Sequence, residues 1–181
     1  MVRYFFLFNP KFVIFSYIFK LMNDEKIIGG FAISNFFRGL NTEQIKYLLP
    51  YMQRFEFRKG MVILREGEVA DSLYFVLQGV VGVYKRKKGT VKPDIVKDEL
   101  GQKIGEVSKG ETFGELAIFD NFPRSASCVA ETDCTIFIFP RRNFEKLEKE
   151  NKEISYALLK NIVKIIGMRL RRADERLVEL L

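Results

Sequence analysis

The sequence predicts an α+β fold that is mainly β: an antiparallel roll or barrel with helices at both ends. Three observations support it. Apolar residues recur at helical spacing before residue 52, short β-branched and aromatic runs separated by glycine fill 54–140, and helical spacing returns after Pro140. Short strands with regular turn signals are typical of all-β rolls and barrels.

The N-terminal residues 1–30 are predicted to form a hydrophobic extension, separate from the domain that follows. The longest uncharged run in 1–22, Phe12–Phe19, is shorter than the about 20 apolar residues that span a membrane. Lys11 also interrupts the apolar region that a signal peptide needs. Three interpretations stay open: 1–22 contacts a membrane surface, it packs on a partner, or translation begins at Met22.

A helical pattern covers the segment from Gly30 to Met52, and Leu40–Glu43 has the composition of a capped helix start. Strand-like runs follow after residue 54. They are Met61–Leu64, Leu73–Leu77, Val80–Tyr84, Cys128–Ala130 and Thr135–Phe139. These runs predict the strands of the roll.

The polar segment between Tyr84 and Lys109 is predicted to be a solvated loop. It includes four consecutive cations at 85–88. A soluble hairpin tip is the expected role of these cations, and contact with nucleic acid or lipid is the alternative.

Two helices are predicted after Pro140. Asn143 is expected to cap a short helix that ends at Glu150. A longer helix from Lys152 to Leu181 would extend about 45 Å.

Two apolar stripes follow the long helix. The first is a seam with alternating three- and four-residue spacing, formed by Leu159, Ile162, Ile166, Leu170, Ala173, Leu177 and Leu180. The second consists of Ile154, Leu158, Ile165 and Met168. We expect one stripe to cover the roll and the other to meet a second copy, which gives a parallel homodimer through 152–181. Packing of the seam on the protein's own roll is the alternative for its N-terminal half.

The composition limits the function. Lys and Arg number 30 against 23 Asp and Glu, and the net charge of +7 favours an anionic partner such as a nucleotide, a nucleic acid or a membrane. Histidine is absent from the sequence, which excludes Ser-His-Asp and Cys-His chemistry. We therefore expect neither enzyme activity nor a metal site. Cys128 and Cys134 lack metal or redox spacing and are predicted to be buried free thiols, consistent with a reducing cytoplasm.

The segment from Phe113 to Ala126 has the strongest functional signal. Gly114 permits a tight turn, and Glu115–Phe119 can form one helical turn whose free N–H groups point at an anion. Arg124 offers a planar fork of donors for two phosphate oxygens, and Ser125 adds a hydroxyl. The carboxylate at the start of the turn can accept a ribose hydroxyl. These residue types suit a sugar phosphate.

This segment resembles the phosphate-binding cassette of the cyclic nucleotide-binding domain family. A second stretch, Phe57–Gly79, resembles the opening strands of that family's β-roll, with glycines where the strands reverse. The resemblance covers roughly Phe31 to Leu181. It implies a double-stranded β-roll (jelly-roll-like barrel) with N-terminal helices, a short phosphate-cassette helix and a long C-terminal helix. The implied division is a cyclic nucleotide-binding domain at 31–150 and a dimerisation and hinge helix at 151–181.

The resemblance also implies roles for the residues of the site. In the family, the cassette glutamate holds the ribose 2′-hydroxyl and the arginine pairs with the cyclic phosphate. The expected ligand-binding residues are Gly114, Glu115, Leu116, Ala117, Arg124, Ser125 and Ala126. The expected neighbours of the base are Arg172, Ala173 and Asp174 on the long helix. Ser125 favours cyclic AMP over cyclic GMP, because some eukaryotic members use Thr there to favour cyclic GMP.

We therefore expect a cytoplasmic cyclic nucleotide sensor that relays ligand occupancy through its C-terminal helix to a downstream protein. Two alternatives stay open: a DNA-binding transcriptional regulator of the catabolite activator type, and a ligand-free interaction module with a degenerate pocket. Direct DNA binding is not expected, because no further helical pair follows the long helix before Leu181. A structural salt bridge between Glu115 and Arg124 is the non-functional explanation of the cassette.

Overall fold

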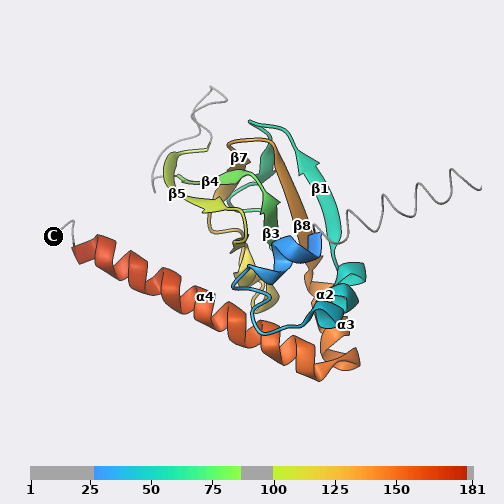
Figure 1. Ribbon diagram of the computed structural model, residues 1–181. Coiled ribbons are helices and arrows are strands. Elements are labelled where there is room, and N and C mark those ends of the chain that lie inside the picture. Colours follow the sequence, from blue (N-terminus) through green and yellow to red (C-terminus); the bar gives the residue numbers. More distant parts are fainter. Residues whose placement is uncertain (1–26, 87–99, 179–181) are drawn as a thin grey trace, which may run out of the picture.

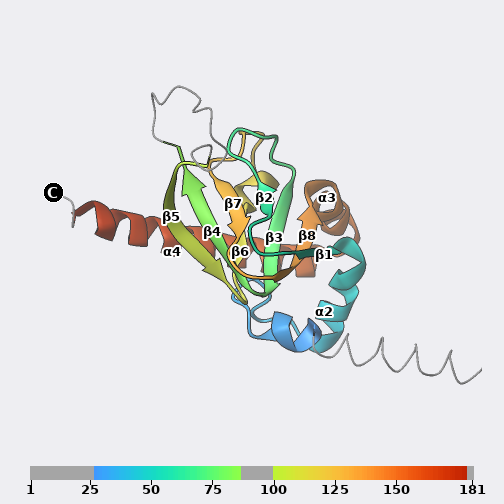
Figure 2. The ribbon, with the colours of Figure 1, turned by 90° about the horizontal axis from the view of Figure 1, so that it is seen from above.

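The computed structural model describes residues 27–86 and 100–178. Two antiparallel four-stranded sheets form a β-roll, with the strand orders β1-β8-β3-β6 and β2-β7-β4-β5 (Figure 1). Helices α2 and α3 lie at one end of the roll, while α4 passes along one side and extends beyond it (Figures 1 and 2). The predicted mainly-β roll with helices before and after it is confirmed.

The elements follow one another with short connections. Their bounds are α2 Thr42–Leu48, η1 Leu49–Tyr51, β1 Gln53–Phe57, β2 Val62–Leu64, β3 Ser72–Gln78, β4 Val80–Lys85, β5 Gln102–Ser108, β6 Thr112–Phe113, η2 Glu115–Ile118, β7 Ser127–Ala130, β8 Cys134–Pro140, α3 Arg141–Glu150 and α4 Lys152–Val178. A further helical segment covers 27–32. The five predicted strands correspond to β2, β3, β4, β7 and β8.

The prediction of a solvated loop from Tyr84 to Lys109 is wrong for residues 102–108. These residues form β5 and pair with β4, in a register that places Val81 opposite Val107. Most side chains of β5 are exposed, so its local sequence is polar and carries only a weak strand signal. Pairing with β4 makes it a strand. Residues 87–99, which include half of the predicted cation run, lie outside the described residues.

The N-terminal ends of α2 and α3 are formed in different ways. Asn41 caps α2 as expected and forms a capping box with Gln44. The predicted cap at Asn143 is wrong, because α3 begins two residues earlier, directly after Pro140 at the end of β8. Asn143 instead donates from Nδ2 to the carbonyl oxygen of Tyr51, at 2.8 Å. It therefore joins α3 to the end of η1.

The main hydrophobic core lies between the helices and the sheet that contains β3 and β8. Phe31 occupies its centre, with its ring stacked on Phe37 at 4.4 Å and edge-on to Phe75 at 4.8 Å. Ile27 and Ile28 belong to the same core, although they fall inside the range 1–30 that was predicted to be a separate extension. The division at residue 30 stays a prediction.

Helix α4 contributes to this core with residues of both predicted stripes. The buried residues are Ile154, Leu158, Ile162 and Ile165, with Leu159 and Ile166 packed against them. In its N-terminal half the seam therefore packs on the protein's own roll. Farther along, Leu170 and Leu177 are about 60% exposed. The homodimer through 152–181 stays a prediction.

Two further expectations concern the chain as a whole. Cys128 and Cys134 are buried free thiols, as predicted. No helix within 27–86 or 100–178 is long and apolar enough to cross a membrane. The interpretations of 1–22 and of a start at Met22 fall outside the described residues.

Candidate functional site

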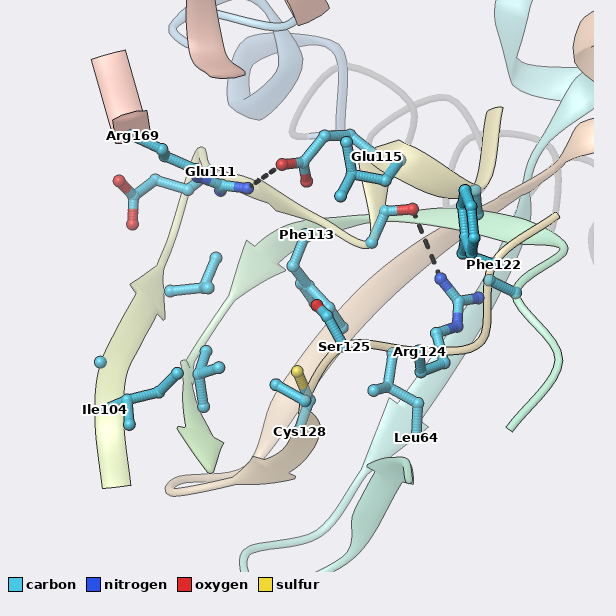
Figure 3. A pocket seen from close by; sticks show the side chains of 18 of the residues that line it. Leu64, Ile104, Glu111, Phe113, Glu115, Phe122, Arg124, Ser125, Cys128 and Arg169 are labelled. Carbon is cyan, nitrogen blue, oxygen red and sulfur yellow. Dashed lines mark hydrogen bonds and ion pairs between the residues drawn. The ribbon is translucent and has the colours of Figure 1, made fainter. Parts of the chain in front are cut away.

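A cavity of about 640 Å³ opens between the sheet containing β4 and β5, the segment around η2, and helix α4 (Figure 3). Its walls combine apolar and charged residues. The apolar ones include Leu64, Val83, Ile104, Val107, Phe113 and Cys128. The charged ones include Glu115, Arg124, Arg169 and Arg172. The cavity can therefore accept a ligand with both an apolar part and an anionic part.

Gly114 shapes the edge of this cavity. Its φ of +69° lies in the left-handed region, which favours glycine, and it caps the start of η2. A Cβ there would lie 2.6 Å from Nη1 of Arg124. Glycine is thus required both by the turn and by the close approach of the guanidinium. The first N–H groups of η2 lack partners within that helix and face outward from its start.

Arg124 is a buried cation, with only 7% of the residue exposed. Its Nη1 donates to the carbonyl oxygen of Gly114 at 3.4 Å, and its guanidinium lies 5.2 Å from the centre of the Tyr74 ring. The carboxylate paired with it, Asp71, is 3.9 Å away and largely exposed. A buried charge with such distant partners is costly. An anion in the cavity would compensate it.

Glu115 is also buried, and its two carboxylate oxygens differ. Oε1 accepts a hydrogen bond from Nη1 of Arg169 at 2.5 Å (Figure 3), whereas Oε2 is buried and has no hydrogen-bond partner among the described residues. Buried polar atoms in folded proteins nearly always have a partner. Oε2 is therefore available to a ligand hydroxyl. The ion pairs of Glu115 and Arg124 go to Arg169 and Asp71, which does not support a structural bridge between the two cassette residues.

The structure brings most of the predicted site residues to one cavity. Gly114, Glu115, Leu116, Ala117, Arg124, Ser125 and Ala126 all line it, as do Arg172 and Ala173. Asp174 differs from this expectation, because it is exposed and does not line the cavity. Each residue of an α-helix is turned by about 100° from the one before it, which carries Asp174 away from the cavity.

Arg169 also lines the cavity, although it was not among the predicted site residues. It joins α4 to the site, since it donates to Glu115 and to the carbonyl oxygen of Thr112. A signal was available: Arg169 follows the buried residues Ile162 and Ile165 at spacings of seven and four. A charged residue that continues a buried helical stripe requires a buried partner.

The Cys128 thiol, which lines the cavity, is uncharged at neutral pH. Burial raises the pKa of the Cys128 thiol to about 12. Burial also raises the pKa of the Tyr74 phenol, although the nearby Arg124 opposes that change. The charges that line the cavity therefore belong to its arginines and to its carboxylates, which include Glu106, Glu111, Glu115 and Asp120.

Comparison with known proteins identifies the family. The sequence profile of the cyclic nucleotide-binding domain matches residues 54–151, more than half of the chain. The chain belongs to the cyclic nucleotide-binding domain family. The cyclic nucleotide-binding domain spans β1 to the end of α3 and includes the whole cassette segment.

Relatives of this cyclic nucleotide-binding domain occur in larger proteins. The cAMP-dependent protein kinase regulatory subunit of Neurospora crassa is 37% identical over 94 residues, which cover 51% of this chain and 24% of that protein. The cyclic AMP receptor protein of Thermus thermophilus is 29% identical over 143 residues, 78% of this chain and 59% of that protein. The chain thus spans about a quarter of the regulatory subunit and less than two thirds of the receptor.

A solved structure agrees over most of the chain. A cyclic nucleotide-binding domain from Methylobacillus flagellatus superimposes with a TM-score of 0.74 at 25% identity. The match covers 88% of this chain and 85% of the other. It therefore includes helices as well as the roll.

Proposed function

We propose that this protein is a cyclic nucleotide sensor that binds cyclic AMP in preference to cyclic GMP and reports occupancy through α4 to a partner. One observation carries the proposal: the buried Arg124, distant from its carboxylate partner, shares a cavity with Glu115, whose Oε2 has no partner within 27–86 and 100–178. A cyclic phosphate supplies the anion that Arg124 lacks, and a ribose hydroxyl supplies the donor that Glu115 lacks.

The rest of the cavity fits the other parts of such a ligand. Ser125 and the outward-facing N–H groups at the start of η2 add donors beside the phosphate. Val83, Ile104 and Val107 offer apolar surface to a purine. Arg172 and Ala173 lie on the α4 side, where the base is expected. The preference for cyclic AMP is supported by Ser125 and by the names of the Neurospora and Thermus relatives.

Titration calorimetry of the full chain tests the binding. We expect one cyclic nucleotide per chain, with cyclic AMP bound more tightly than cyclic GMP. 5′-AMP should bind more weakly than either, because its open phosphate has a different shape and charge. Absence of heat with both cyclic nucleotides at millimolar concentration would contradict the proposed function.

The relay depends on the contact between Arg169 and Glu115. A ligand hydroxyl on Glu115 changes the partners of the carboxylate that holds Arg169, so occupancy acts directly on α4. Because Arg169 faces the cavity, it is better explained as part of this sensor than as part of a DNA-binding helix. The downstream partner is expected to recognise the position of α4.

Arg169→Met is expected to uncouple α4 from the ligand. Cyclic AMP affinity should fall by less than about tenfold, because more than a third of the Arg169 side chain is exposed. The nucleotide-dependent change in hydrogen exchange along 166–178 should become much smaller. Arg171→Met is the control, because the Arg171 side chain lines a different surface of α4. An undiminished exchange response in Arg169→Met would refute the relay.

A further inference from the structure

Arg141 is the first residue of α3, yet its guanidinium contacts the cassette and not its own helix. Nε donates to the carbonyl oxygen of Ala117, at the end of η2. The two Nη atoms donate to Oδ1 of Asn121 and to the carbonyl oxygens of Asp120 and Ala70, the last at 2.8 Å. All four acceptors are uncharged, so these contacts hold backbone and loop in place and do not form a simple ion pair.

The acceptors of the Arg141 guanidinium belong to two segments of the chain, 117–121 and the loop that contains Ala70. Ala117, Asp120 and Asn121 belong to the cassette segment that leads to Arg124. Ala70 belongs to the loop before β3, next to Asp71, which pairs with Arg124. The backbone N–H of Arg141 also donates to the carbonyl oxygen of Asp71, at 2.7 Å. One residue of α3 thereby joins the two segments between which the Arg124 guanidinium is held.

We propose that Arg141 is a positioning residue for nucleotide binding, which holds the segment 117–124 in the shape that presents Arg124 and η2 to the phosphate. This positioning role rests on the proposed function. The planar guanidinium has five N–H donors in a rigid fork, which suits several acceptors at fixed angles. An ammonium group is a point charge on a flexible chain and cannot span the same acceptors. The positive charge of the Arg141 guanidinium also lies beside the C-terminal end of η2, where helix carbonyl oxygens give a partial negative charge.

Calorimetry on variants tests the proposal. Arg141→Ala is expected to lose at least about tenfold in cyclic AMP affinity, because a loose cassette must be ordered on binding. Arg141→Lys should show a similar loss. Millimolar methylguanidinium should restore part of the affinity of Arg141→Ala, whereas a merely destabilised fold would not respond to it. Arg142→Ala, the exposed neighbour on the same helical turn, should bind like the wild type.

Hydrogen exchange without nucleotide provides an independent readout. The amides of 115–121 should exchange at least about tenfold faster in Arg141→Ala and in Arg141→Lys than in the wild type, while those of β3 and β8 stay protected. If Arg141→Ala does not fold, Arg141→Lys decides the outcome. Wild-type affinity together with unchanged exchange at 115–121 would overturn the proposal. If the wild type binds no cyclic nucleotide, the proposed function fails, and the exchange rates still show whether Arg141 orders this segment.

Discussion

Arg124→Leu should weaken cyclic AMP binding by about 2–5 kcal/mol, which is about 30-fold to 5,000-fold in affinity. The change removes the buried guanidinium that faces the cavity and leaves the phosphate charge unpaired. Leucine is apolar and smaller, so it can lie against the Tyr74 ring without leaving a buried charge. The fold should survive, because the polar partners of the Arg124 guanidinium in the described part of the chain are 3.4 Å and 3.9 Å away.

Calorimetry and thermal unfolding of the variant, side by side with the wild type, measure the two effects separately. Arg54→Leu is the matched control, because Arg54 lies exposed on β1 and pairs with Glu56. That variant should bind cyclic AMP normally. Equal affinity of Arg124→Leu and wild type would remove Arg124 from the site. A loss of affinity accompanied by unfolding would assign it a structural role instead.

Phe31→Ala is expected to reduce the free energy of unfolding by about 3–5 kcal/mol. The Phe31 ring is fully buried and contacts three other aromatic rings, those of Phe37, Phe75 and Phe137. Truncation leaves a cavity where the segment 27–32 meets the β-sheet. The remaining rings belong to different elements and cannot all move to fill it.

Urea denaturation followed by circular dichroism measures this loss. Ile33→Ala is the control, since Ile33 lies two residues away and is 71% exposed; its effect should be within about 0.5 kcal/mol of zero. The dependence of the unfolding free energy on urea should be unchanged in both variants. A loss below about 1 kcal/mol for Phe31→Ala would show that the segment 27–32 contributes little to the core.

The cassette was predictable because its parts are close together in the chain. Gly114 and Arg124 are ten residues apart, and each is specified by its own chemistry: a left-handed turn for the glycine and a fork of donors for the arginine. The strands β3, β4 and β8 were predictable for a similar reason, since their apolar side chains mark them locally. Local signals of this kind do not depend on the rest of the fold.

The residues that act across the fold were not predictable in the same way. Arg169 is 54 residues from Glu115, and Arg141 is 71 residues from Ala70. Their partners are largely backbone carbonyl oxygens, which every residue carries, so no residue type in the sequence identifies them. The strand β5 escaped prediction because only its pairing with β4 makes it a strand.

The amino-acid sequence by itself determined the mainly-β fold with helices at both ends, the lack of histidine chemistry, and the glycine, glutamate and arginine of the cassette. Only the tertiary structure decided which side of α4 faces the cavity, that Arg169 pairs with Glu115, that Asp174 does not line the cavity, and that the Arg141 guanidinium contacts the cassette segment. The physical reason is that side-chain type and spacing act over a few residues, whereas burial and hydrogen-bond partners depend on which distant segments pack together.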